Sequence, residues 1–341
     1  MPARSEPSSI CSPATAPAAP LISISLDLDN LWSYMKTHGD AGWEAFPSYL
    51  DTLAEIVIER LRRHGLKITV FIVGQDAALD KNRSALRAIA DAGHEIGNHS
   101  FRHEPWLHRY APAEIAEEIE RAEEHITLAT GKRPRGFRGP GFSFSVDTLR
   151  VLARRGYAYD ASTFPTFLGP LARAYYFWNT RGMPTEERRK RSNLFGTAGE
   201  GLRSIRPYIW SLDGSQILEI PVTTMPVFKV PIHLSYLIYL ARFSKALAGA
   251  YLRTWIGLAR LWRVEPSFLL HPLDFLGGDR VRELAFFPGM DLDTAFKLDF
   301  FDEVMAQIKK SFFPVSMEAH AEAIIARGSV PSRKPRSEGS P

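Results

Sequence analysis

The sequence predicts an α/β fold: a distorted (β/α) barrel over residues 21–326 with an inserted loop and helical region. Two observations support this prediction. Segments with strand patterns alternate with segments of helical spacing, which is typical of parallel strands joined by helices. Polar side chains suited to chemistry also recur where the predicted strands end, and a barrel gathers its functional groups at that edge.

The composition is that of an ordinary globular protein. The chain has 341 residues, of which 45% are hydrophobic and 23% charged, so its length allows one large domain. The formal net charge of +4 is too small to indicate a nucleic-acid partner. Cys11 is the only cysteine, which excludes an internal disulfide and a thiolate metal site.

Both ends of the chain are rich in small, polar and proline residues, so we expect disordered tails at 1–20 and 327–341. No apolar core of signal-peptide length precedes Pro20. No run of about 20 apolar residues predicts a membrane span. We therefore expect a cytoplasmic protein.

The first predicted strand, 21–29, reads L-I-S-I-S-L-D-L-D and alternates strictly. This alternation places Asp27 and Asp29 on one face of the strand. A helix at 46–64 ends at Gly65, and 67–74 follows as the second strand.

The same alternation continues along the chain. Further helices are expected at 83–92, 112–130 and 146–155. Further strands are expected at 93–97, 136–140, 157–162, 217–222, 267–271 and 314–317. Residues 164–215 fit this pattern poorly and contain the charge run Glu186–Arg191, so we interpret them as an insertion.

Three residues form a candidate metal site. His99 and His103 are four apart, and imidazole suits zinc and similar ions. This pair alone is more often two ordinary polar histidines, but a carboxylate from another strand end favours a metal site. Asp27 and Asp29 provide such a pair: one would bind the metal and the other would act as a base. A turn or helix cap remains the alternative for one of the two aspartates.

Two further residues stand at predicted strand ends. Arg138 precedes a Gly-Pro-Gly turn and could hold a carboxylate through two hydrogen bonds. A surface arginine before a loop explains this segment equally well. His271 ends an apolar strand and could act as a general acid near neutral pH, although such a histidine is more often structural.

The ordered set of motifs resembles the NodB-homology polysaccharide deacetylases, also called carbohydrate esterase family four. The motifs lie in family order between residues 22 and 272: S-L-D-L-D, H-S-F-R-H, R-G-P-G-F-S, Y-D-A-S and L-L-H-P. The resemblance implies a barrel of the NodB-homology type. It also implies a hydrolase that removes an N-acyl group, in most cases acetyl, from an amino sugar of a glycan or glycolipid.

The resemblance assigns a role to each matching residue. Asp29, His99 and His103 would bind one divalent metal, usually zinc in this family. Asp27 would be the catalytic base and Arg138 would hold it. His271 would protonate the leaving amine, and Asp160 would tune His271.

The sequence departs from the family pattern at two positions. Gly141 stands where the family often has a tyrosine, although its backbone N–H could still stabilise the oxyanion. Ala161 replaces a common tryptophan. Phe142, Trp106 or Phe164 would then supply the apolar wall.

Two other functions remain open. A deformylase of a lipid-linked aminosugar would use the same residues. An inactive carbohydrate-binding module is the alternative of another class, although every motif keeps its reactive side chain.

Residues 231–263 form a long apolar and aromatic segment that predicts either a barrel-covering helix or a helix at a membrane surface. In one uninterrupted helix its five basic residues would fall in an arc of about 80°, although Gly249 could break that helix. Trp255 and Trp262 would lie near lipid headgroups in the membrane interpretation. That contact would place the protein at the inner face of the membrane. The basic residues are Arg242, Lys245, Arg253, Arg260 and Arg263.

Overall fold

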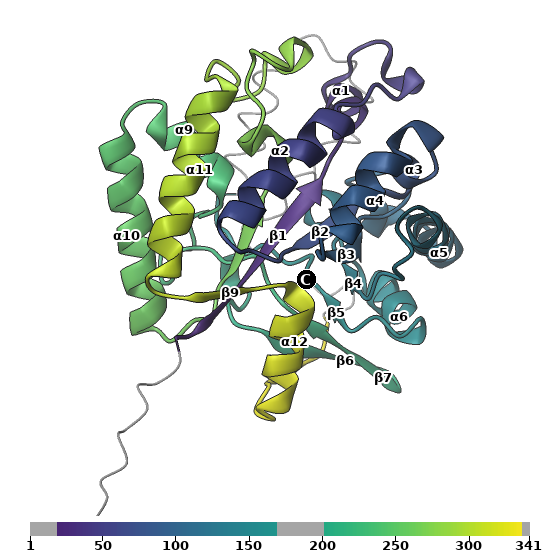
Figure 1. The fold of residues 1–341 in the computed structure, drawn as a ribbon. Coiled ribbons are helices and arrows are strands. Elements are labelled where there is room, and N and C mark those ends of the chain that lie inside the picture. Colours follow the sequence, from purple (N-terminus) through teal and green to yellow (C-terminus); the bar gives the residue numbers. More distant parts are fainter. Residues whose placement is uncertain (1–18, 169–200, 336–341) are drawn as a thin grey trace, which may run out of the picture.

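The computed structural model describes residues 19–168 and 201–335. Its ten strands form one sheet in the order β10-β6-β7-β5-β4-β3-β2-β1-β8, and β9 pairs with the start of β1 (Figure 1). All neighbours are parallel except β6 and β7, which form an antiparallel pair. The strands are β1 (Leu21–Leu28), β2 (Thr69–Ile72), β3 (Glu95–Asn98), β4 (Gly136–Phe137), β5 (Tyr159–Asp160), β6 (Tyr208–Leu212), β7 (Ser215–Glu219), β8 (Ser267–Leu270), β9 (Phe313–Val315) and β10 (Ser332–Arg333).

The segment after β7 brings the sheet round into a distorted barrel. The Thr223 N–H donates to the Ser267 carbonyl at 3.0 Å, and the Ser267 N–H donates to Thr223 Oγ1 at 2.7 Å. Val222 N–H donates to the Thr163 carbonyl at 2.9 Å, just past β5. These bonds join the β5–β7 side of the sheet to β8, so the predicted fold class is confirmed.

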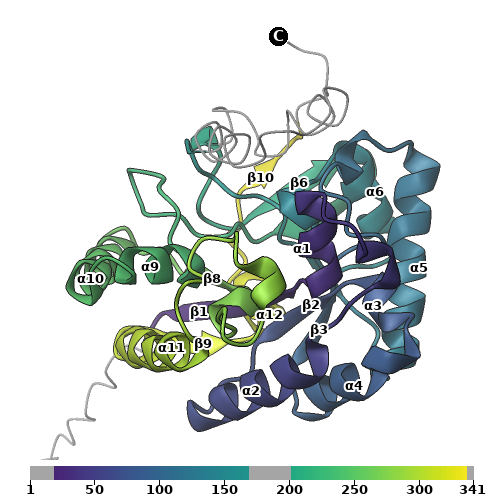
Figure 2. The same cartoon turned by 90° about the horizontal axis from the view of Figure 1, so that it is seen from above.

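Helices cover the outside of this barrel. Figure 2 shows α2, α4, α5 and α6 around one part of the sheet and α10 and α11 around another. The helices are α1 (Leu31–His38), α2 (Leu50–Arg63), α3 (Gly74–Ala77), α4 (Arg83–Asp91), α5 (Pro112–Thr130), α6 (Val146–Arg154), α9 (Leu234–Ala241), α10 (Lys245–Leu261), α11 (Thr294–Lys309) and α12 (Met317–Ala326).

The polar face of β1 lies inside the barrel and not in solvent. Ile22, Ile24, Leu26 and Leu28 join the main hydrophobic core, while Ser23, Ser25 and Asp27 are buried as well. A strand with both faces buried is expected of a parallel sheet. The buried polar groups have partners there: Ser23 Oγ is bonded to His320 Nδ1 at 3.0 Å, and Arg138 contacts the other two.

Each of the eight predicted strand segments overlaps a strand. Two strands, β6 and β10, were not predicted. β6 falls inside the expected insertion, where its pairing with β7 makes it part of the sheet. β10 pairs with β6 beyond the expected domain end at residue 326. The charge run at 186–191 lies outside the described residues.

The apolar segment 231–263 forms two helices, α9 and α10. The break falls at 242–244, where Ser244 caps α10, and Gly249 lies inside α10. Trp255 is fully buried against Phe268 and Phe312, so its expected place near lipid headgroups is wrong. Its side of α10 packs on the barrel because Ala248, Leu252 and Ala259 are buried along the same face. No helix of the described ranges is long and apolar enough to cross a bilayer.

Candidate active site

Asp29, His99 and His103 meet just beyond the ends of β1 and β3. Their ligand atoms all lie within 4.8 Å of one another. Asp29 Oδ1 is 2.8 Å from His103 Nε2 and 3.5 Å from His99 Nε2. Burial would raise the pKa of Asp29, but the two histidines outweigh it and lower that pKa below its ordinary value. The predicted set therefore comes together in space.

The loop that carries both histidines is a tight turn and not a helix. Ser100 and His103 have φ of 59° and 54°, so the chain twice takes a left-handed conformation that side chains rarely adopt. The buried Glu118 of α5 holds the loop by accepting the N–H groups of Phe101 and Arg102 at 3.1 and 2.9 Å. This strained turn is what directs both rings toward Asp29.

The donor set fits a divalent metal ion. Asp29 Oδ1 and His103 Nε2 are buried and have no hydrogen-bond partner among the described residues, although they are close together. His99 Nδ1 donates to the Arg138 carbonyl at 2.6 Å, which leaves its Nε2 lone pair facing Asp29. Metal-binding histidines typically donate the N–H of the other ring nitrogen in this way, which fixes the ring orientation. One carboxylate and two imidazoles with an open position match a catalytic zinc-type site.

The second aspartate of β1 is held by Arg138. Arg138 Nη1 donates to Asp27 Oδ1 at 2.6 Å and to Ser25 Oγ at 2.8 Å, and its Nε donates to the Ala161 carbonyl at 3.0 Å. The guanidinium is fully buried and lies 4.5 Å from the centre of the Phe71 ring. Arg138 is therefore an interior residue, and the surface alternative is wrong.

The turn after β4 depends on glycine. A Cβ on Gly139 would stand 1.8 Å from the Ser143 carbonyl oxygen, and Gly141 has φ of +58°. Ser162 Oγ accepts the Gly139 N–H at 2.8 Å and donates to Asp160 Oδ1 at 2.6 Å. Asp160 thus supports the turn that carries Arg138 and Gly141.

His271 has a different carboxylate partner from the expected one. Its Nδ1 lies 3.2 Å from Ser235 Oγ, which donates to Asp274 Oδ1 at 2.7 Å. Asp274 Oδ2 also accepts the His271 backbone N–H at 2.8 Å. Asp160 instead accepts a hydrogen bond from Ser162 and lies opposite the buried Glu219 in the register of β5 and β7. The expectation that Asp160 contacts His271 is therefore corrected. Ser235, at the start of α9, and Asp274, in the turn after β8, are the residues that hold His271.

A row of rings connects the glycine turn to His271. The rings of Phe142 and Phe164 are tilted by 33° with centroids 4.7 Å apart. The centroid of Phe164 lies 6.0 Å from that of His233, and the centroid of His233 lies 5.4 Å from that of His271. Burial lowers the pKa of His233 well below its ordinary value. Of the three residues expected to form an apolar wall, Phe142 and Phe164 belong to this row and Trp106 does not.

Sequence reasoning missed Ser235, Asp274 and His233. Asp274 had a weak signal, because a carboxylate three residues after His271 can cap the short turn that follows. Ser235 and His233 lie in the apolar segment at the start of α9, where nothing in the sequence pointed to the site.

The middle of the chain resembles a known protein family. Residues 40–159, which include His99, His103 and Arg138, match a family model described as Polysaccharide deacetylase. A peptidoglycan deacetylase from Helicobacter pylori is 29% identical over 149 residues, or 42% of this chain and 49% of that protein. The chain spans half or less of the length of such curated relatives.

Solved structures share the fold. A Mycobacterium smegmatis structure described as a polysaccharide deacetylase has a TM-score of 0.61 at 19% identity, covering 96% of this chain and 98% of that one. A Pseudomonas aeruginosa structure with the same description has a TM-score of 0.52 at 17% identity, covering 90% and 91%. At these identities the likeness shows the fold alone.

Proposed function

We infer that this chain is a member of the polysaccharide deacetylase family, whose model its residues 40–159 match, and that it is a hydrolase that removes an N-acetyl group from an amino sugar of a glycan. The observation that carries this proposal is the convergence of three kinds of group at one end of the barrel: a metal triad, the Arg138–Asp27 pair, and the His271–Ser235–Asp274 group. The name of the H. pylori relative favours peptidoglycan as the glycan.

The metal triad and Asp27 would prepare the nucleophile. A divalent ion, expected to be zinc, held by Asp29, His99 and His103 would polarise the acyl carbonyl and acidify the attacking water. Asp27 Oδ1 is fixed by Arg138, so the other carboxylate oxygen is available to accept the proton from that water. The attack forms a bond between the water oxygen and the acyl carbon.

Two groups would serve the second half of the reaction. The backbone N–H of Gly141 would donate to the developing oxyanion. His271 would donate its proton to the amide nitrogen as the carbon–nitrogen bond breaks, releasing a carboxylate and a free amino sugar. Ser235 contacts His271 Nδ1, so the opposite ring nitrogen is the one that would face the leaving group.

The structure disfavours an inactive binding module. Such a protein would have no use for buried ligand atoms that lack hydrogen-bond partners, and Asp29 and His103 contribute two of these. Unsatisfied buried polar atoms are costly unless function requires them.

The test is acyl release from a panel of substrates, followed by mass spectrometry. We expect the zinc-loaded protein to release acetyl groups from peptidoglycan fragments or chitin oligomers. A chelator should abolish this release. N-formylated and lipid-linked aminosugars in the same panel distinguish a deformylase. Asp27→Asn protein is the control for contaminating hydrolases. Release of no acyl group from any member by metal-loaded protein would refute the proposal.

A further inference from the structure

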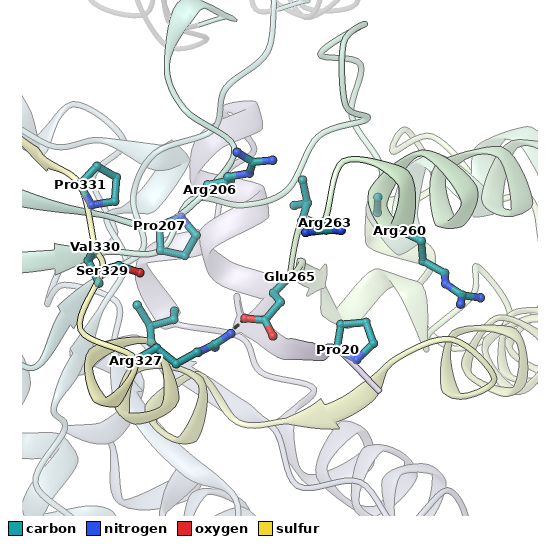
Figure 3. A pocket seen from close by; sticks show the side chains of 13 residues that line it. Pro20, Arg206, Pro207, Arg260, Arg263, Glu265, Arg327, Ser329, Val330 and Pro331 are labelled. Atoms are coloured by element: carbon teal, nitrogen blue, oxygen red, sulfur yellow. Dashed lines mark hydrogen bonds and ion pairs between the residues drawn. The ribbon is translucent and has the colours of Figure 1, made fainter. Parts of the chain in front are cut away.

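A cavity lies at the end of the barrel strands that is opposite the metal triad. It has a volume of about 580 Å³ and lies beside Pro20, which precedes β1, and Glu265, which precedes β8 (Figure 3). The metal triad and His271 follow the opposite ends of the same two strands. Since β1 has eight residues, the two sites are separated by roughly 26 Å along that strand.

The lining of this cavity is strongly basic. It contains four arginines and one acidic residue, Glu265. Arg327 is paired with Glu265 at 2.6 Å, as the dashed line in Figure 3 shows. Burial would raise the pKa of Glu265, but His320 and Arg327 lower it to about 2. Glu265 therefore neutralises one arginine and leaves three positive charges, on Arg206, Arg260 and Arg263.

The protein itself provides few partners for these three exposed arginines. The Arg206 side chain donates to the Trp262 carbonyl. The side chains of Arg260 and Arg263 make no hydrogen bond or ion pair within 19–168 and 201–335. Arg263 also has φ of 51°, a conformation that costs energy in a residue with a side chain. Arg206, Arg260 and Arg263 are exposed beside one cavity, where their guanidinium groups can pair with an anionic group from solution.

Apolar side chains project from the rim of the same cavity. Leu261 is 72% exposed and Trp262 is 42% exposed, and both lie between Arg260 and Arg263 in the chain. Trp262 also lines a smaller hollow that adjoins the first through Arg206 and Val264. Exposed tryptophan and leucine next to unpaired arginines is the arrangement that binds the boundary between lipid headgroups and acyl chains.

We propose that this cavity and its rim bind the phosphate headgroup of an anionic phospholipid, and that the end of α10 attaches the protein to a membrane surface. Arginines suit phosphate because their planar guanidinium groups match its oxygens. A free phosphate would also pair with the arginines, but it would make no use of the exposed apolar side chains of Leu261 and Trp262. The proposal does not depend on the deacetylase activity.

The test is co-sedimentation of the full chain with vesicles at low salt. We expect binding to phosphatidylcholine vesicles that contain phosphatidylglycerol, and none to phosphatidylcholine alone. Each arginine near an anionic surface contributes about a factor of five to binding, so Arg260→Gln/Arg263→Gln should weaken binding on the order of 30-fold. Trp262→Ala should also weaken it.

The matched control is Arg242→Gln/Lys245→Gln, which removes the same charge from the same segment. Both of these residues are already paired, with Asp291 and Glu303, so this variant should bind vesicles like the wild type. Equal loss in both double variants would mean diffuse charge attraction and would overturn the proposal. Binding of inorganic phosphate by calorimetry without vesicle binding would also overturn it, in favour of a soluble anion.

Discussion

Asp29, His99 and His103 hold one carboxylate oxygen and two imidazole nitrogens within 4.8 Å of one another, which suits a single divalent ion. The Nδ1–H of His99 is committed to the Arg138 carbonyl, and two of the facing ligand atoms have no hydrogen bond among the described residues. Arg138 thus contributes twice to the site: its carbonyl orients His99 and its guanidinium orients Asp27.

We predict that purified protein binds about one divalent metal ion per chain. Asp29→Ala and the double variant His99→Ala/His103→Ala should lose it, because each removes a ligand. His125→Ala, on α5 and outside the triad, is the matched control and should keep it. Metal content measured by elemental mass spectrometry decides this, and full retention in the double histidine variant would contradict the assignment.

The two aspartates of β1 should behave differently when replaced. Asp27→Asn should keep the metal and lose deacetylation, because Asp27 contacts Arg138 and is not a member of the triad. Asp29→Asn should lose both. Metal content and acetate release are measured on the same samples. Loss of metal from Asp27→Asn alone would mean that Asp27 is the ligand and Asp29 the base.

At the scale of elements, the start of α9 and the turn after β8 position the proposed general acid. Lys297 of α11 is buried and donates to the carbonyls of Leu273 and Leu276 at 2.7 and 2.9 Å, which fixes the turn that carries Asp274. Burial lowers the pKa of Lys297 to about 8. The apolar segment 231–263 therefore has a second role besides covering the barrel, because α9 delivers Ser235 to His271.

We predict that Asp274→Asn and Ser235→Ala slow deacetylation by misplacing His271, and that His271→Ala costs roughly 10²–10⁴ in rate. The loss should be large for amides and small for activated esters, whose leaving groups need no proton. Metal content should be unchanged. Equal slowing of both substrate types would show that these residues do not act through proton donation.

The pairing of β5 with β7 buries two carboxyl groups side by side. Asp160 and Glu219 are partners in the strand register, and burial raises the pKa of both above the ordinary range. The folded protein therefore retains protons that the unfolded chain releases. Stability from this pair is present below the ordinary carboxyl pKa of about 4 and is lost as pH rises through the raised values.

We predict that Asp160→Asn reduces this loss, because an amide donates to Glu219 at every pH. The midpoint temperature of thermal unfolding should fall less steeply between about pH 5 and pH 8 in this variant than in the wild type. Asp213→Asn removes an exposed surface carboxylate and should leave the profile unchanged. A wild-type slope in Asp160→Asn would show that the pair does not hold an extra proton.

At the scale of the whole molecule, the barrel is completed by hydrogen bonds and not by a regular strand. Thr223 provides both a backbone donor and a side-chain acceptor to Ser267. Ser235 and Asp274, which form the hydrogen-bonded group around His271, lie on the β8 side of this junction. Asp160 lies on the β5 side. Junction and site are therefore linked through β8, which carries His271 at its end.

We predict that Thr223→Val destabilises the protein by about 1–3 kcal/mol, because it leaves the buried Ser267 N–H without an acceptor. Chemical denaturation measures this change. Thr254→Val, at an exposed position of α10, is the matched substitution and should stay within about 0.5 kcal/mol. Similar values for both variants would mean that the Thr223 side chain contributes nothing to closure.

The sequence by itself predicted the fold class, the approximate positions of eight strands, and a metal site made of His99, His103 and one of the two aspartates of the first strand. These depend on local patterns: alternation reveals a strand, and a side chain at a strand end faces the mouth of a barrel wherever the neighbours lie. The choice of Asp29 as the ligand and the pairing of Asp27 with Arg138 came from the resemblance to the NodB-homology family.

Only the tertiary structure decided which partner each side chain has. Ser235 and Asp274 reach His271 from separate elements, and a contact made 36 residues away along the chain has no local signature. β6 was hidden for the same reason, since its role depends on β7 beside it. Trp255 was misplaced because helical spacing shows which residues share a face but not which face the barrel covers.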